Sequence, residues 1–313
     1  MVLICAFRAM VSFRCNNCLA VRHDLLTLAT SMLIGATALV LACVRHEVQA
    51  AQPLGATSKR QAREEAKRAI PWRQLTVQQR QAVQSVCKKS NIYRRLPVQV
   101  IDCDPEIFSF LMQRPEVVAD IWRTLGVSKL KVERQGPQTY SAEDGMGTTG
   151  QFSFLSAEWG KNAFNRVLIF SEGSFQGKPL PRPIHARCVM LLRTGSVVET
   201  NGRTYVTARL DTFLDIEHMG VELVAKIIQP LITRVADHNF TETLTFVSNF
   251  SRAAEQNPAG VEHFAQRLDA LDSATRDQLI KLCYAAGRSI KAGQEEGKKV
   301  ASLAPPEMEP STE

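Results

Sequence analysis

The sequence predicts an α+β domain, in which an antiparallel sheet of about six or seven strands is wrapped on a long C-terminal helix, with additional N- and C-terminal helices. Two observations favour this fold class. From Val127 to Ile216 apolar residues recur with a period of two, and turn residues separate the runs, as in successive antiparallel strands. From Arg203 to Phe240 a long strand runs directly into an amphipathic helix, which needs a sheet to lie on.

Residues 1–50 are expected to be a signal peptide or a membrane anchor. Leu25–Val44 contains no charged residue and has about the length of a bilayer-spanning helix. Val48-Gln49-Ala50 follows it as a small-x-small cleavage pattern, so removal and retention of the leader both stay open. Either route predicts an exported protein, periplasmic or membrane-anchored, whose domain lies near the membrane through residues 25–44. Residues 51–74 are interpreted as a basic linker, flexible or weakly helical.

Most of the net charge of +7 is expected to lie outside the folded body. Residues 1–50 contribute +2 and the run Lys59–Arg73 contributes +4, so the rest of the chain is nearly neutral. A nucleic-acid-binding domain carries its positive charge on the folded body, because neutralising phosphates dominates that affinity. The sequence therefore predicts no nucleic-acid partner.

Four cysteines follow the leader, namely Cys87, Cys103, Cys188 and Cys283. In an exported chain an even number permits two disulfides with three possible connectivities. The alternative is that each cysteine is a small buried apolar side chain. The residues alone leave both interpretations open.

The first ordered element is expected to be the helix Thr76–Lys89, with Thr76 as its N-cap. A short strand is predicted over Pro97–Cys103. Asp104 followed by proline and glutamate is a strong helix start. Pro115 then predicts a break into a second helix, which Gly126 ends.

Six strands are expected next, over Lys129–Arg134, Gln138–Ala142, Gly150–Ser156, Arg166–Phe175, Ile184–Thr194 and Thr204–Ile216. Asn201-Gly202 favours a two-residue hairpin turn before the last strand. Short turns between strands require an antiparallel meander, because parallel strands need long crossover connections.

The remainder is predicted to be helical. The expected helices are Val221–Ala236, ending at a corner over Asp237–Asn239, then Thr241–Glu255, Val261–Leu271, and a last helix capped by Ser273 and closed by Gly287. Residues 75–290 are interpreted as a single domain. Residues 291–313 have no apolar period and are expected to be a disordered tail.

No catalytic constellation is found. Gly145-Met-Gly147-Thr-Thr-Gly150 matches a dinucleotide-binding pattern, but a strand follows it where a helix is required, so a hairpin tip with positive φ is the better interpretation. Asp211, Asp215, Glu217 and His218 could suit a metal, but their spacing matches no ligand set. Asp215 or Glu217 is better explained as a helix cap and first-turn acid. We therefore expect no metal and no cofactor, and we favour a non-catalytic domain over an enzyme that uses Asp211, Asp215 and His218.

The element order resembles the START-like (helix-grip) superfamily over roughly Leu96–Gln256. The resemblance rests on a first strand, two helices over Asp104–Gly126, the meander, and the strand-to-helix junction Arg203–Phe240. It implies a curved sheet around a long helix, with a cavity between them for a lipid or another apolar ligand. The residues expected to line this cavity are Val221, Val224, Ala225, Ile228, Leu231, Ile232, Val235, Tyr205 and Phe213.

The stretch Ile92–Gly126 is also similar to uncharacterised exported proteins of planctomycete bacteria. This second resemblance implies a bacterial envelope setting and supplies no activity. The alternative to a ligand-binding domain is a structural or interaction protein of the cell envelope, in which the inner face of the helix is filled core and holds no ligand. The same apolar residue types line pockets and cores, so the sequence leaves both functions open.

Overall fold

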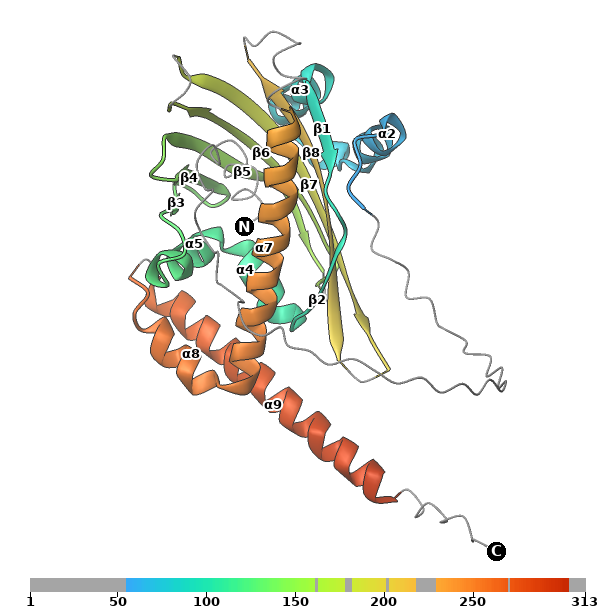
Figure 1. Ribbon diagram of the computed structural model, residues 1–313, viewed down its shortest axis with the longest axis vertical. Helices are drawn as coiled ribbons and strands as arrows, with labels where there is room; N and C mark the ends of the chain where they lie inside the picture. The colour runs from blue at the N-terminus through green and yellow to red at the C-terminus, as the bar shows by residue number, and fades with distance from the viewer. Residues whose placement is uncertain are drawn as a thin grey trace, which may run out of the picture.

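The computed structural model describes residues 55–160, 163–177, 182–200, 203–217, 229–269 and 271–303, apart from the side chains of residues 229–232 and 290–303. These residues form an α+β domain with helices on both faces of one sheet (Figure 1). The helices are α2 (Arg60–Ala69), α3 (Val77–Lys89), α4 (Pro105–Gln113), α5 (Pro115–Thr124), α7 (Gln229–Gln256), α8 (Pro258–Ala265) and α9 (Ser273–Leu303). None of these helices has the length and apolar character to cross a bilayer. Leu25–Val44 lies outside the described residues.

The sheet is antiparallel and has eight strands in the order β1-β8-β7-β6-β5-β4-β3, and β2 also pairs with β8. The strands are β1 (Ile92–Arg95), β2 (Gln99–Asp102), β3 (Lys131–Arg134), β4 (Thr139–Glu143), β5 (Thr148–Trp159), β6 (Asn165–Phe175), β7 (Ile184–Val198) and β8 (Thr204–Ile216). The predicted meander from β3 to β8 is confirmed. The short strand predicted over Pro97–Cys103 is β2, and the count exceeds seven because β1, which was not predicted, pairs with the same edge of β8.

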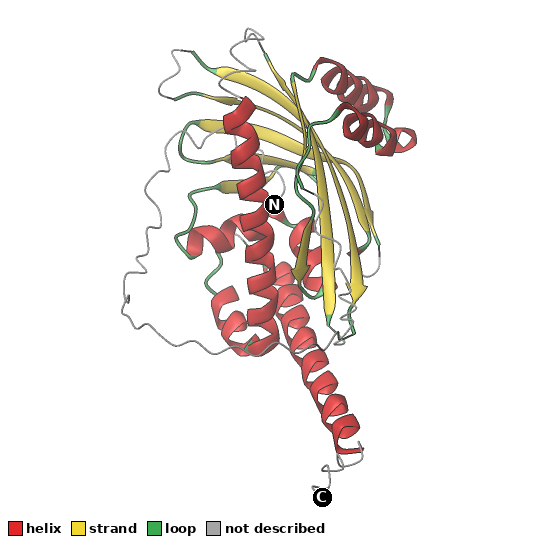
Figure 2. Cartoon of the chain, turned by 45° about the vertical axis from the view of Figure 1, so that its right-hand side comes forward, coloured by secondary structure: helices red, strands yellow, loops and turns green. Residues whose placement is uncertain are grey.

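The two faces of the sheet carry different clusters, as the alternation along β8 shows. Val206, Ala208 and Leu210 belong to the main core, which also contains buried residues of α4, α5 and α7. Phe213 belongs to a second cluster with α2 and α3. We call these sides the inner face and the outer face. Figure 2 shows α7 on one side of the curved sheet and α2 and α3 on the other.

Local sequence signals determine where the helices that follow β2 begin and end. The Asp104 carboxylate accepts hydrogen bonds from the backbone N–H groups of Glu106 and Ile107, and Pro105 takes the first helical position. Pro115 opens α5 after a one-residue break at Arg114, as predicted. At the other end Gly126 has φ 71°, the left-handed conformation expected of a helix stop. The predicted capping role of Thr76 on α3 is also confirmed, with a complete capping box.

Helix α7 continues through the corner that the sequence predicted at Asp237–Asn239. Its inner side buries Ala236, Phe240, Leu244 and Val247, which repeat every three or four residues across that point. The Asp237 carboxylate is paired with the Arg94 guanidinium on β1, so the polar side chain does not need to end the helix. The corner prediction was therefore wrong.

The predicted basic linker contains a docked helix. Within α2, Ala62 and Ala66 are buried against the outer face, with Ile70 and Leu75 beside them. Small apolar residues four positions apart let the helix approach the sheet closely, while its charged residues surround that narrow stripe. Residues 60–69 are therefore part of the fold rather than a spacer.

The C-terminal helices also differ from the prediction. The Asp272 carboxylate accepts the backbone N–H of Thr275, so Asp272 rather than Ser273 caps α9. Gly287 does not end the helix, since α9 continues to Leu303. Residues 291–303, predicted to be disordered, are therefore helical. Residues 304–313 lie outside the described part of the chain.

The glycine-rich segment forms the hairpin tip between β4 and β5, as predicted. Gly145 and Gly147 have φ values of 68° and 107°. The Asp144 carboxylate accepts the backbone N–H groups of Met146 and Thr148 and closes the turn. A Cβ at Gly147 would lie 2.1 Å from the carbonyl oxygen of Gln176, so only glycine fits there.

Candidate functional site

An apolar groove of about 600 Å³ lies between α5, α7 and α8. Its lining residues are mostly apolar or aromatic, with three amide side chains among them, and no charged side chain is included. The residues are Ile121, Leu125, Phe246, Asn249, Phe250, Ala253, Gln256, Asn257, Gly260, Val261 and Phe264. Ligand pockets of about 300–1,000 Å³ with apolar walls and a few polar groups bind small organic molecules.

Aromatic packing shapes the wall of the groove. Phe246 lies edge-on to Trp122 of α5 with ring centroids 5.5 Å apart, and it is tilted against Phe250 at 6.2 Å. Aromatic pairs at this separation stabilise one another beyond the area that they bury. The wall is therefore held in place by α5 and α7 together.

The ends of two helices form the rim. Leu125 follows α5 and is 53% exposed. Asn257 caps α8 by accepting the backbone N–H of Gly260, which turns the chain sharply after α7. An exposed leucine beside partly exposed phenylalanines leaves apolar area in water, which an apolar ligand would cover.

Of the residues predicted to line a cavity, those whose side chains the structure describes do not line this groove. Val221, Val224, Ala225 and Ile228 lie outside the described residues, as do the side chains of Leu231 and Ile232. Val235 is half-buried and packs against the main core on the inner face.

The other two predicted residues lie on β8. Phe213 is fully buried on the outer face, where its ring contacts Tyr93 with centroids 5.0 Å apart. Tyr205 is half-buried and shares the outer face with Phe213, because residues an even number apart on a strand point to the same side. Neither side chain faces α7, so their assignment to a cavity between the sheet and that helix was wrong.

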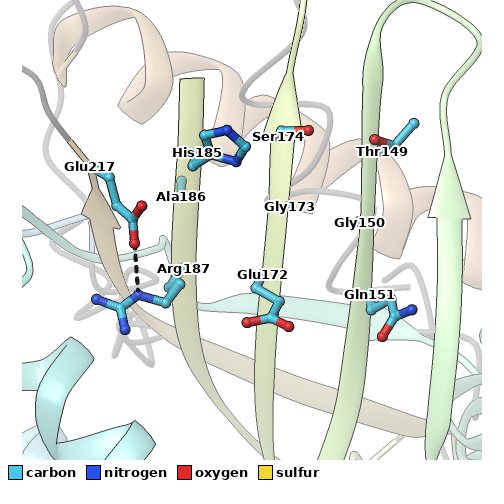
Figure 3. Close-up of a pocket in the computed structure, with 10 residues that line it drawn as sticks. All are labelled: Thr149, Gly150, Gln151, Glu172, Gly173, Ser174, His185, Ala186, Arg187 and Glu217. Atoms are coloured by element: carbon cyan, nitrogen blue, oxygen red, sulfur yellow. Dashed lines mark ion pairs between the residues drawn. The ribbon is translucent and has the colours of Figure 1, made fainter. Parts of the chain in front are cut away.

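A polar hollow of about 420 Å³ lies on the outer face over β5 to β8 (Figure 3). Its labelled residues are Thr149, Gly150, Gln151, Glu172, Gly173, Ser174, His185, Ala186, Arg187 and Glu217. Ser174 and His185 are direct cross-strand partners, as a nucleophile and a base would be. In Figure 3, however, the Ser174 hydroxyl points away from the imidazole, and Glu217 pairs with Arg187 at 3.5 Å. The hollow does not present an assembled catalytic triad.

Asp211 lies at the centre of a buried ionic network beneath α2. Its side chain is fully buried and accepts hydrogen bonds from Tyr93 Oη at 2.7 Å, Arg95 Nε at 2.7 Å and Arg193 Nη2 at 2.8 Å. Arg209 Nε lies 4.0 Å from the same carboxylate. Glu65 of α2 adds bonds to Arg95 and Arg209 at 2.8 Å each. We refer to these six residues as the Asp211 network.

The pKa values of three network residues, Tyr93, Glu65 and Arg95, are shifted from their ordinary values. Burial, and then the hydrogen bond to Asp211, raises the pKa of the Tyr93 phenol well above its ordinary value. Burial also acts to raise the pKa of Glu65, but its hydrogen bond to Arg95 and the charges of Arg209, Arg95 and Arg193 outweigh that effect and lower it. The raised pKa keeps the Tyr93 phenol protonated, so that it can donate to Asp211. The lowered pKa keeps Glu65 ionised, so that it can bind the surrounding arginines.

Two of the four residues considered for a metal site, Asp211 and Asp215, are instead bound by arginines. Asp211 is bound by arginines, and Asp215 lies within β8, 2.7 Å from Arg187. Arginine side chains occupy the carboxylate oxygens that a cation would need. The described part of the chain contains no group of three or more histidine, cysteine or acidic side chains placed to hold a metal ion. Asp215 is therefore a strand residue rather than a helix cap, and His218 lies outside the described residues.

The four cysteines after the leader are free thiols and all are buried. Burial raises the pKa of Cys87, Cys188 and Cys283 to about 12, and it raises that of Cys103 as well. A thiol with a raised pKa is a poor nucleophile and a poor metal ligand. Of the two interpretations of these cysteines, the structure shows the small buried apolar side chain.

No family model matches the chain, and no curated protein matches it. Among solved structures, the chain matches the crystal structure of a conserved protein from Geobacillus kaustophilus with 11% sequence identity and a TM-score of 0.24. The match covers 49% of this chain and 97% of that one.

Proposed function

We propose that the chain is an exported or membrane-anchored, non-catalytic domain that binds an apolar ligand, such as a lipid acyl chain, in the groove between α5, α7 and α8. The observation that carries this proposal is the uncharged, aromatic wall of a groove large enough for a ligand. A charged or strongly polar ligand would lose hydration there without gaining a charged partner. Export and the position near the membrane follow from Leu25–Val44 and its flanking residues.

We also propose that the fold is of the START-like, helix-grip kind. The antiparallel meander that leads into a helix of 28 residues supports it, as does the burial of Phe240, Leu244 and Val247 on the sheet side of that helix. The same burial fills the described part of the inner face with core. For this reason the ligand is assigned to the groove beside α7 rather than to a cavity beneath it.

The filled inner face also supports a second function, that of a structural or interaction protein of the envelope without a ligand. The two functions differ in what the groove holds. Native mass spectrometry of the full chain, released from a maltoside detergent, with extraction and identification of retained lipids, separates them.

Ala253→Trp is the informative variant because Ala253 is exposed and lines the groove, so an indole there would fill it. Ala259→Trp is the matched control, on an exposed α8 position outside the lining. We expect a retained apolar ligand on the wild type and on the control, and its loss from Ala253→Trp. Equal retention by all three proteins, or no retained ligand on any, would contradict ligand binding in the groove.

A further inference from the structure

Three arginines form a row across the outer face of the sheet, the face on which α2 lies. Arg166 on β6 is the cross-strand partner of Arg193 on β7, and Arg193 is the partner of Arg209 on β8. Like charges directly opposite one another on neighbouring strands are destabilising. The repulsion between these three positive charges must therefore be offset by negatively charged groups.

The protein supplies part of this compensation. Glu158 binds Arg166 at 2.7 Å, Asp211 binds Arg193 at 2.8 Å, and Glu65 binds Arg209 at 2.8 Å. The same Asp211 and Glu65 carboxylates also neutralise Arg95, which lies beside the row. Four guanidinium groups thus face three carboxylates, and one positive charge remains in excess.

Unused hydrogen-bond donors accompany the excess charge. The Nε atoms of Arg166, Arg193 and Arg209 are each buried and have no hydrogen-bond acceptor among the described residues. Buried donors are nearly always paired in folded proteins, and unpaired ones point to a water or ion at the site. The arginine side chains retain a route to solvent, since those of Arg193 and Arg209 are 26% exposed and that of Arg166 is 42% exposed.

We propose that the row of Arg166, Arg193 and Arg209 is a binding site for a phosphate group. Neighbouring strands are about 4.8 Å apart, so three guanidinium groups in one row can converge on a single tetrahedral anion. The planar guanidinium offers parallel N–H donors that match phosphate oxygens, and one bound anion supplies the missing negative charge. The site does not depend on the apolar groove, which lies on other elements.

Two sources could supply the phosphate group: inorganic phosphate, or the headgroup of a phospholipid. A phospholipid headgroup is considered because α2, which packs on the same face, begins at Arg60, soon after the apolar segment Leu25–Val44 in the sequence. The test therefore has two arms, both on the full chain in a maltoside detergent. One arm is calorimetric titration with inorganic phosphate. The other is transfer of the protein to vesicles of phosphatidylglycerol, compared with vesicles of phosphatidylcholine.

Arg166→Gln is the first variant because, among the described residues, the Arg166 side chain bonds to Glu158 alone, so the fold should survive its loss. Arg193→Gln is the second variant, with its folding checked by circular dichroism. Arg187→Gln is the matched control: Arg187 lies on the same face, but it pairs with two carboxylates, Asp215 and Glu217, and therefore has no excess charge.

We expect the wild type to bind phosphate, and Arg166→Gln and Arg193→Gln to bind it about ten-fold more weakly, the effect of losing one charge-assisted hydrogen bond. Arg187→Gln should bind like the wild type. Binding to the anionic vesicles alone, lost in Arg166→Gln, would support the headgroup as the source. The proposal is overturned if neither probe binds in an Arg166-dependent way, or if Arg187→Gln weakens binding as much as Arg166→Gln.

Discussion

Replacing Asp211 by asparagine should destabilise the protein strongly. The substitution keeps the shape of the side chain and removes a charge that is fully buried between Arg95 and Arg193. The Arg95 side chain is only 11% exposed, so it cannot recover the lost interaction from water. Glu65, its remaining partner, is 44% exposed and is shared with Arg209.

The magnitude follows from these exposures. Removing one partner of a buried ion pair costs about 3–5 kcal/mol, because the other charge stays buried. Arg193 is about one-quarter exposed and regains part of its hydration, which favours the lower end of that range. We expect a loss of about 3 kcal/mol, a large fraction of the total stability of a typical domain, about 5–15 kcal/mol.

The assay is urea unfolding of the full chain in a maltoside detergent, followed by the fluorescence of tryptophan. Trp72 lies next to α2 and reports on this part of the fold. Asp215→Asn is the control, since Asp215 pairs with a more exposed arginine, Arg187, and should cost less. A free energy of unfolding for Asp211→Asn within 1 kcal/mol of the wild type would refute the reasoning.

Three further predictions concern backbone strain, titration and thiol chemistry. Gly147→Ala should lower the free energy of unfolding by at least about 1–3 kcal/mol because of its positive φ and blocked Cβ position; Gly136→Ala, whose Cβ would make only an ordinary contact with Thr139 at 4.0 Å, should not, and equal effects would contradict the turn geometry. Burial raises the pKa of Glu255 above its ordinary 4.5, so the folded state holds this proton more tightly than the unfolded state does. The stability that the protonated Glu255 contributes is therefore lost as the pH rises through its folded-state pKa. The stability of the wild type should therefore fall relative to that of Glu255→Gln as the pH rises above 4.5, and a constant difference in urea unfolding would contradict this. Cys188 should resist thiol reagents at pH 8 until the protein is denatured, because burial raises its pKa to about 12. Labelling is followed by peptide mass spectrometry, and rapid labelling of the native protein would show an exposed thiol.

Elements with local signals could be predicted from the sequence. Thr76, Asp104 and Pro115 act on backbone groups within a few residues of themselves, so their roles as caps and as a break needed no knowledge of tertiary structure. The continuation of α7 through Asp237 was missed because its partner, Arg94, lies on a distant strand. Tertiary contacts overrode the local polarity that suggested a corner.

The docked helix α2 was missed for a different reason. Its charged residues dominate the composition, and its interface consists of alanines, which carry little hydrophobic signal. The groove could not be predicted because its walls combine α5 with α7 and α8, more than one hundred residues later in the sequence. Phe246, Phe250 and Phe264 have the spacing and character of core residues, and only the packing of three helices shows that a groove stays open between them.

Photo-crosslinking tests ligand binding in the groove most directly. The full chain is incubated with a fatty acid that carries a diazirine on its acyl chain, irradiated, digested and mapped by mass spectrometry, which distinguishes the groove from the apolar leader. Adducts are expected in peptides from residues 246–264 of the wild type and of Ala259→Trp, and they should be lost in Ala253→Trp. Adducts confined to other segments, or unchanged adducts in Ala253→Trp, would contradict an apolar ligand site between α5, α7 and α8.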